Sequence, residues 1–253
     1  MSNIAIITAR GNNESIPDKN IIKIVGKPAV GYAIDAAYKS KLIDDVFIST
    51  NCEKISRVGQ AFGCKIIMRP AELALPDTNH GDVIAHAVRV VKDEYYPDLK
   101  IVTVLLGNTV MVTPELIDLS IKILEKRSDI DSVMSVWQAQ DDHPYRALKM
   151  NDKGLLESFL NVECGTSRQY YPKVYFYDQG VWTFRYWCVF EKKGPNPWWW
   201  MGERCFPIIR RWVTGRDFHT DLDIRISEFW LTSNEKDIIE NIEDIKKILE
   251  DDK

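Results

Sequence analysis

The sequence has few cysteines, no long apolar run and no excess of positive charge, and each of these absences excludes a class of protein. Its five cysteines are odd in number, irregularly spaced and form no C-x-x-C pair, so they predict neither a disulfide framework nor a structural zinc site. No stretch approaches the roughly 20 apolar residues that a membrane span requires. The N-terminus has no basic segment followed by an apolar region. We therefore expect a cytoplasmic protein with no membrane partner.

The charge of the chain excludes a broad polyanion-binding surface. Lysine and arginine together number 33 and aspartate and glutamate 37, which gives a formal net charge of -4 at pH 7. A surface for nucleic acid or an anionic membrane would need clustered lysines and arginines. We predict no nucleic-acid partner, and any phosphate binding has to be local.

Four catalytic motifs are also missing. The sequence contains no G-x-x-x-x-G-K-[ST], no G-x-G-x-x-G after the first apolar run, no G-x-S-x-G and no H-E-x-x-H. ATPases, dehydrogenases, serine hydrolases and zinc proteases therefore lose their usual sequence support. The four histidines lie far apart in the sequence, which favours ordinary structural roles over a metal cluster.

What is present is an alternation of short β-rich runs with helical periods. Expected strands lie near residues 4–8, 45–49, 65–68, 101–106 and 132–137, and expected helices cover 29–39, 53–62, 82–93 and 114–126. Thr113 before Pro114 suits the cap and first turn of the last of these helices. The pattern is typical of an α/β fold with a doubly wound, mostly parallel sheet. Ligands of such sheets bind beyond the carboxyl ends of the strands.

The chain is long enough for one main domain, residues 1–253, with an excursion at about 142–200 where the alternation breaks. Residues 170–200 are dense in aromatics, and strands are expected around 174–184. We favour extra core or a subunit interface as the role of these aromatics, with a sugar-stacking wall as the alternative. A final amphipathic helix is predicted over 234–251.

The opening loop is the first candidate site. An apolar run, Ile4 to Ala9, leads into residues 10–20, which contain one glycine and three asparagines and carry Arg10 and Lys19. Two cations in such a loop at the end of a first strand are suited to an anion, and a nucleoside triphosphate is the anion we expect.

The second candidate site is the segment 219–225. If it is extended, a period of two places His219, Asp221, Asp223 and Arg225 on one face. Two converging carboxylates suit magnesium, which takes a few carboxylate oxygens together with the oxygens of a substrate phosphate. A solvated acidic turn explains the same pair equally well.

Several segments together resemble the cytidylyltransferases that make CMP-activated sugar acids, among them the CMP-sialic (acylneuraminate), pseudaminic, legionaminic and Kdo synthetases. The resemblance covers most of the chain in the family's order, which makes it more specific than any single motif. The similar segments are Ala9-Arg10 with Lys19-Asn20, Gly26-Lys27-Pro28, Ser49-Thr50, Arg69 to Ala74 with Asp77-Thr78, Arg168-Gln169 with Pro172, Gly180, and Asp221-Leu222-Asp223.

The resemblance implies a Rossmann-like nucleotidyltransferase fold and a reaction in which a hydroxyl of an acidic sugar attacks the α-phosphorus of CTP, so that pyrophosphate leaves. It implies a homodimer formed through the β-rich excursion, with Mg²⁺ held by Asp221 and Asp223. The implied catalytic residues are Arg10, Lys19 and Asp223. The implied nucleotide-binding residues are Ala9, Arg10, Gly11, Asn12, Asn13, Lys19, Asn20, Arg69 and Asp77, and the implied acceptor-binding residues are Asn108, Arg168, Gln169, Tyr177 and Gln179.

Three departures from the family pattern point to an acceptor other than ordinary sialic acid. Asn13-Glu14 stands where the family has serine and lysine, the loop after the fourth expected strand (105–112) lacks the family's glutamine and arginine, and 175–179 is closer to the pseudaminic type. Three alternatives follow: a cytidylyltransferase for a different acidic acceptor, a nucleotide-binding relative with impaired catalysis, and a GT-A type glycosyltransferase. The last normally has its D-x-D motif in mid-domain.

Overall fold

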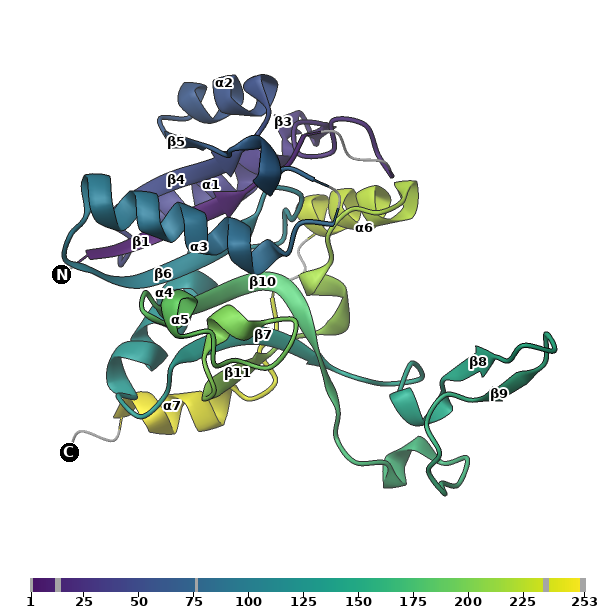
Figure 1. Cartoon of the computed structure of the whole chain (residues 1–253). Coiled ribbons are helices and arrows are strands. Elements are labelled where there is room, and N and C mark those ends of the chain that lie inside the picture. Colours follow the sequence, from purple (N-terminus) through teal and green to yellow (C-terminus); the bar gives the residue numbers. More distant parts are fainter. Residues whose placement is uncertain (1, 12–14, 76, 234–236, 251–253) are drawn as a thin grey trace.

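The computed structural model describes residues 2–11, 15–75, 77–233 and 237–250, and these form a seven-stranded sheet with helices on both faces (Figure 1). The strand order is β11-β7-β10-β6-β1-β4-β5. The strands are β1 (Ser2–Thr8), β4 (Asp45–Thr50), β5 (Lys65–Met68), β6 (Leu99–Leu106), β7 (Ser132–Gln138), β10 (Tyr175–Arg185) and β11 (Cys205–Ile209). Two short pairs lie outside this sheet, β2 (Lys23–Ile24) with β3 (Lys27–Pro28) and β8 (Leu148–Met150) with β9 (Leu156–Ser158).

The sheet is mostly parallel, as predicted. Strand β1 pairs in parallel with β4 and β6, β4 with β5, and β7 with β11, whereas β10 runs antiparallel to both β6 and β7. Ile4, Ile6 and Ile7 in β1 are fully buried, because a central strand of such a sheet is covered on both faces. The carboxyl ends of β1, β4 and β6 therefore meet at one edge of the sheet.

The helices cover both faces, which confirms the doubly wound arrangement. Helices α1 (Ala29–Lys39), α2 (Glu53–Ala61), α4 (Pro114–Lys126) and α7 (Ile242–Glu250) enclose one apolar core, and α3 (His80–Val90) and α5 (Cys188–Glu191) enclose the other. Thr113 caps α4 as predicted, since its hydroxyl accepts a hydrogen bond from the Leu116 amide at 3.2 Å. The helix expected over 82–93 begins at His80 and ends at Val90, where a π-helical turn takes over.

Residues 219–225 are not extended, the condition under which their side chains would share one face, because helix α6 runs from Asp221 to Thr232. Thr220 and Asp223 form a capping box: the Thr220 hydroxyl accepts from the Asp223 amide, and the Asp223 carboxylate accepts from the Thr220 amide. These two reciprocal bonds satisfy free amides of the first helical turn, and they stabilise a helix in preference to the alternating strand.

The last helix is shorter than predicted. It begins at Ile242 and not near residue 234, because Ile239 pairs with Arg210 in an isolated antiparallel bridge and holds the chain extended. Residues 234–236 lie outside the described part of the chain. In the described ranges no helix is both long enough and apolar enough to cross a bilayer. All five cysteines carry free thiols.

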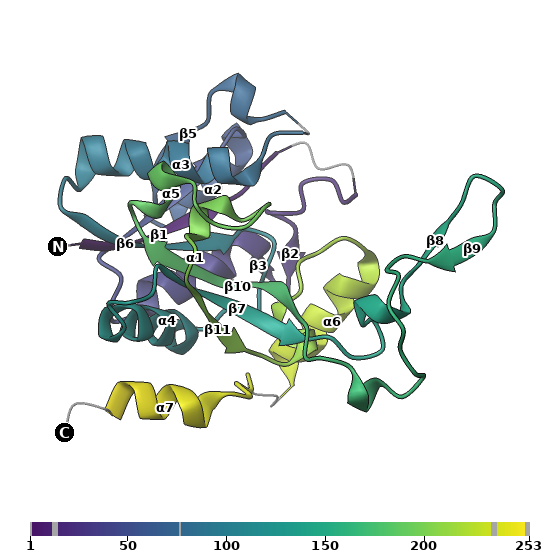
Figure 2. The same ribbon diagram turned by 60° about the horizontal axis from the view of Figure 1, so that its bottom comes forward.

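Between β7 and β10 the chain leaves the body of the molecule as a projecting segment, residues 139–174, which we call the arm (Figures 1 and 2). The arm contains the β8–β9 hairpin and covers the first part of the excursion expected over 142–200. From Tyr175 the chain returns to the sheet as β10, which confirms the strand expected around 174–184. Trp200 is 2% exposed and packs beside Trp182 in the core, so this tryptophan has the core role that we favoured.

Candidate active site

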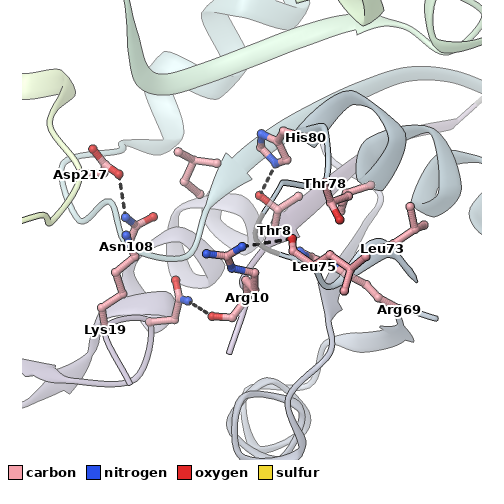
Figure 3. Close-up of a pocket in the computed structure, with 13 residues that line it drawn as sticks. Thr8, Arg10, Lys19, Arg69, Leu73, Leu75, Thr78, His80, Asn108 and Asp217 are labelled. Atoms are coloured by element: carbon pink, nitrogen blue, oxygen red, sulfur yellow. Dashed lines mark hydrogen bonds between the residues drawn. The ribbon is translucent and has the colours of Figure 1, made fainter. Parts of the chain in front are cut away.

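A cavity of about 280 Å³ lies beyond the carboxyl ends of the central strands, where the topology predicts a ligand site (Figure 3). Its walls come from the ends of β1, β5 and β6, from residues 73–78, from the first turn of α3 and from the loop before α6. The lining residues are Thr8, Arg10, Lys19, Asn20, Arg69, Leu73, Leu75, Thr78, His80, Val83, Leu106, Asn108 and Asp217. Among these described residues, three side chains are cationic and one is a carboxylate.

Arg10 and Lys19, the two predicted cations of the opening loop, both line this cavity. The Arg10 guanidinium donates to the Leu75 carbonyl at 3.3 Å, and Asn20 donates to the Arg10 carbonyl at 2.7 Å, which ties the end of the loop to its start. Lys19 Nζ donates to the Phe218 carbonyl at 3.3 Å. Burial lowers the pKa of Lys19, and Arg10 adds to the lowering while Asp217 opposes it. An anion in the cavity would therefore gain from both cations.

Arg69 also lines the cavity, close enough to Arg10 for the two charges to repel each other. Its Nε donates to the Ser49 hydroxyl at 2.9 Å and its second terminal nitrogen to the Ser49 carbonyl at 2.7 Å. Burial lowers the pKa of Arg69 to about 10, and repulsion from Arg10 contributes. The bonds to Ser49 fix the direction in which the guanidinium faces the cavity, which supports the predicted nucleotide contact.

His80 is a cavity residue that sequence reasoning did not select. Its Nε2 lies 3.0 Å from the Thr8 hydroxyl, and its ring packs edge-on against Trp182 and Trp200. Burial and the nearby Arg69 charge lower the pKa of His80 to about 4. The imidazole is therefore neutral at pH 7. In the sequence His80 was indistinguishable from a surface histidine, because its burial depends on tryptophans more than 100 positions away.

The low pKa of His80 predicts a pH-dependent stability. Unfolded histidine titrates near pH 6.5, so between about pH 6.5 and 4 the unfolded chain binds a proton that the folded chain does not. Lowering the pH from 7 to 5 should cost the wild-type protein about 2 kcal/mol of unfolding free energy through this group. The variant H80Q should lose less over the same interval. Urea unfolding followed by circular dichroism at both pH values measures the difference, and equal losses in the two proteins would contradict the assignment.

Asp217 is the carboxylate of the cavity, and it is not among the residues that we predicted. One carboxylate oxygen accepts from Asn108 Nδ2 at 2.8 Å (Figure 3). The other lies 2.9 Å from His219 Nε2. Asp217 stands in the loop that ends at the Thr220 cap of α6. The signal in the sequence was the T-x-x-D capping pattern at residues 220–223, which predicts the start of a helix. Asp217 then lies in the loop before that helix, where its side chain can face the ends of the strands.

The predicted metal ligands Asp221 and Asp223 both lie on the first turn of α6. Asp223 is 3% exposed; one of its oxygens accepts two bonds from Arg216, and the other accepts from His219 and Thr220. Burial alone would raise the pKa of Asp223, but these hydrogen bonds lower it to about 2. Asp221 is exposed on the first turn of α6, and neither residue lines the cavity. In the described part of the chain no three His, Cys, Asp or Glu side chains gather as metal ligands.

Several predicted nucleotide contacts are placed elsewhere. Ala9 is buried in the core below the cavity. The Gly11 amide donates to Asn51 Oδ1 at 2.9 Å, and a Cβ at Gly11 would come within 2.7 Å of Cys52. Asp77 is exposed and does not line the cavity, although the next residue, Thr78, does. Asn12, Asn13 and Glu14 lie outside the described residues.

A second cavity of about 260 Å³ adjoins the first, because Asp217 lines both. It contains the predicted acceptor residues Tyr177 and Gln179, and its walls are aromatic: Trp137, Phe176, Tyr177 and Trp212. Burial and the Asp217 charge raise the pKa of Tyr177. Asn108, also predicted to bind the acceptor, is joined to the second cavity by its hydrogen bond to Asp217. These residues come together as predicted.

Arg168 and Gln169 do not join this group. Both are exposed on the arm, and Arg168 pairs with Asp141 at 3.1 Å. Neither lines either cavity within the described part of the chain. A single copy of the chain therefore does not bring these two predicted residues to the site.

Comparison with curated proteins returns acylneuraminate and pseudaminic acid enzymes. N-acylneuraminate cytidylyltransferase from Streptococcus agalactiae serotype III (strain NEM316) is 29% identical over 181 residues, which cover 68% of this chain and 42% of that protein. Pseudaminic acid cytidylyltransferase from Campylobacter jejuni serotype O:2 is 34% identical over 95 residues, 37% of this chain and 41% of that protein. The matched residues thus span less than half the length of these relatives.

Comparison with solved structures supports the fold. CMP:2-keto-3-deoxy-manno-octonic acid synthetase complexed with CTP aligns with a TM-score of 0.66 at 15% identity and covers 91% of this chain and 98% of that one. The 4-diphosphocytidyl-2C-methyl-D-erythritol synthase of Anaerococcus prevotii aligns with a TM-score of 0.59 at 14% identity, covering 92% of this chain and 96% of that one. At these identities the similarity establishes the α/β nucleotidyltransferase fold.

The family itself follows from the sequence match. Residues 4–153 match the profile of the cytidylyltransferase family. This segment is more than half of the chain; it begins in β1, contains Arg10, Lys19, Arg69 and Asn108, and extends into the arm. The resemblance noted in the sequence is therefore confirmed, and the chain belongs to the cytidylyltransferase family.

Proposed function

We propose that this protein is a CTP-dependent cytidylyltransferase that converts an acidic 2-keto-3-deoxy sugar of the nonulosonic type to its CMP derivative and releases pyrophosphate. The observation that carries the proposal is the pair of adjoining cavities: one has three cations, the other has aromatic walls, and Asp217 lines both. A triphosphate suits the cationic cavity, and a sugar ring suits the aromatic one. The names of the relatives support cytidine as the base and a nonulosonic acid as the acceptor.

In this proposal Arg10 and Lys19 contact the triphosphate and Arg69 faces the cytidine. A hydroxyl of the acceptor attacks the α-phosphorus, a new phosphorus–oxygen bond forms, and the bond to the pyrophosphate breaks. Negative charge grows on the pyrophosphate oxygens, and fixed cations in a partly desolvated cavity stabilise that charge without having to reorganise. The lowered pKa of Lys19 shows that the cavity desolvates its ammonium group.

Magnesium fits Asp217 better than the pair that we predicted. Magnesium usually takes one or two carboxylates and completes its shell with substrate phosphates and water, and Asp217 is the carboxylate that faces the cationic cavity. Asp223 has both oxygens engaged in capping α6 and in its ion pair with Arg216. Asp217 would hold the ion, which would supply positive charge near the α-phosphate.

We also propose that the arm packs against a second copy of the chain. On one face of the β8–β9 hairpin Met150 pairs with Leu156, and these side chains are 72% and 70% exposed. Apolar side chains this exposed on a two-stranded hairpin indicate that the surface is covered in an assembly. Packing against a second copy would also place Arg168 and Gln169 near the cavities of that copy.

The double variant M150E/L156E is therefore expected to be monomeric, because it places two like charges where apolar contact would form. Size-exclusion chromatography with light scattering would give the mass of one chain for the variant and of two for the wild type. Substitution of Lys149 and Glu157 by Gln on the same strands is the matched control and should leave the mass at two chains. A monomeric wild type would contradict the proposal.

The function itself is tested by a pyrophosphate-release assay. CTP, UTP, ATP and GTP are each incubated with magnesium and a panel of acidic 2-keto-3-deoxy sugars, and the CMP product is confirmed by mass spectrometry. We expect release with CTP and one class of acid. Release with acids of another class would correct the acceptor, whereas magnesium-dependent CTP binding without release from any acid would mark a nucleotide-binding relative. No CTP binding at all would overturn the proposal.

A further inference from the structure

A fully buried arginine, Arg210, lies beneath the two cavities without lining either one. It follows β11 and is 0% exposed. Its Nε donates to both oxygens of Asp237, at 3.2 and 3.0 Å, and one terminal nitrogen donates to Asp178 at 3.3 Å. The other terminal nitrogen donates to the carbonyls of Met111, at 2.8 Å, and Thr214, at 3.2 Å. Every nitrogen of the guanidinium therefore has a partner.

The surrounding structure is shaped to hold this charge. Asp178 is itself fully buried and accepts from the Ser135 hydroxyl and from the Gly180 amide. A Cβ at Gly180 would lie 2.2 Å from the Arg210 terminal nitrogen, and a Cβ at Gly215 would lie 2.1 Å from the Asp178 Cβ. Both positions therefore require glycine for the cluster to form. Burying an arginine is costly unless its charge and donors are matched, so this cluster fixes the surrounding backbone closely.

The two carbonyls that Arg210 bridges belong to the two loops that meet in the active site. Met111 lies in the loop after β6, three residues beyond Asn108, and Thr214 lies three residues before Asp217. Asn108 and Asp217 join these loops a second time on the cavity side, at 2.8 Å (Figure 3). Asp178, the ion-pair partner, stands between Tyr177 and Gln179 of the second cavity.

From this arrangement we infer that Arg210 is a positioning residue for nucleotidyl transfer. By holding the loops 107–113 and 212–219 together through their backbone carbonyls, it sets Asp217 against Asn108 at the junction of the cavities. The inference rests on the proposed function. Misplacing a reacting group by about 1 Å can cost about 100-fold in rate. Lysine at this position keeps the charge but has one nitrogen in place of three, so it cannot hold both carbonyls and both aspartates.

Arg185 provides a matched control. It lies at the far end of β10, where its guanidinium donates to the carbonyls of Ile130, Leu124 and Arg127 at 2.9–3.1 Å, and it lines neither cavity. R185K thus removes a similar set of arginine–carbonyl bonds from the same fold without touching the loops of the site.

The experiment compares R210K and R185K with the wild type in steady-state kinetics and in hydrogen exchange read by mass spectrometry. We expect R210K to lower kcat by about 10- to 100-fold, to change the KM for CTP by less than about threefold, and to speed exchange in 107–113 and 212–219. R185K should do none of these. The double variant R210K/D217N should be no slower than D217N, because both changes act through one group.

A kcat of R210K within twofold of R185K, or strictly additive losses in the double variant, would overturn the inference. If R210K does not fold, D237N replaces it, since Asp237 accepts the Nε hydrogen bonds and lines neither cavity. Hydrogen exchange in the two loops is measured without substrate. A wild-type protein that transfers CMP to no acid would refute the proposed function, and hydrogen exchange alone would then test the inference. Unchanged exchange in both loops would then overturn it.

Discussion

The variant D217N is expected to lower kcat/KM for CMP transfer by about 100-fold or more while the protein stays folded. Removing one preorganised charged partner of a transition state costs about 100- to 1,000-fold in well-studied enzymes. Asparagine keeps the shape of Asp217 and one acceptor, so the bond to Asn108 is retained. What is lost is the negative charge beside Lys19 and, under the proposed function, the carboxylate oxygen that would hold magnesium.

The matched control for D217N is D221N, in the same segment. Asp221 is exposed on the first turn of α6 and lines neither cavity, so D221N should retain activity within about twofold. The assay is pyrophosphate release over a range of magnesium concentrations. A D217N protein as active as D221N would refute the role given to Asp217, and loss of activity in D221N alone would restore the pair that the sequence suggested.

The variant D223A is expected to lose about 3 kcal/mol of unfolding free energy at pH 7, the largest stability effect that we predict. It removes an N-cap partner and leaves the Arg216 guanidinium without its buried carboxylate. The low pKa of Asp223 also makes this stabilisation pH-dependent. It is complete above the unfolded pKa near 3.9 and disappears as the pH falls through the folded value of about 2.

Urea unfolding at pH 7 and at pH 3 measures both effects. The wild-type protein should be about 3 kcal/mol more stable than D223A at pH 7, and the gap should narrow at pH 3. D221A is the control, with a loss under about 1 kcal/mol, since Asp221 makes only a favourable interaction with the helix dipole. A D223A protein of wild-type stability that cannot transfer CMP would show that Asp223 acts at the reacting phosphate after all.

The strands, helices and opening loop could be predicted because each depends on neighbouring residues. The apolar run of β1, the cap at Thr113 and the cations Arg10 and Lys19 are all local patterns, and parallel topology alone places the end of β1 at a ligand site. The family resemblance added Arg69, Asn108, Tyr177 and Gln179, and the structure brings all four to the two cavities.

The conformation of residues 219–225 had two local explanations. Asp221 and Asp223 fit both an alternating strand and the first turn of a helix, and only the Thr220 hydroxyl together with the buried Arg216 pairing selects the helix. With that helix formed, Asp217 is the carboxylate that lines the first cavity. Arg168 and Gln169 lie on the arm, and within the described part of the chain they line neither cavity.

By itself the sequence determined the doubly wound sheet, the two cations of the opening loop and the family, because all three follow from periodicity and from motifs with fixed spacing. The tertiary structure alone decided which carboxylate lines the first cavity, why His80 is neutral and how Arg210 clamps two distant loops. Each of these depends on burial and on contacts between segments tens of residues apart or more, and a pattern of neighbouring residues does not encode them.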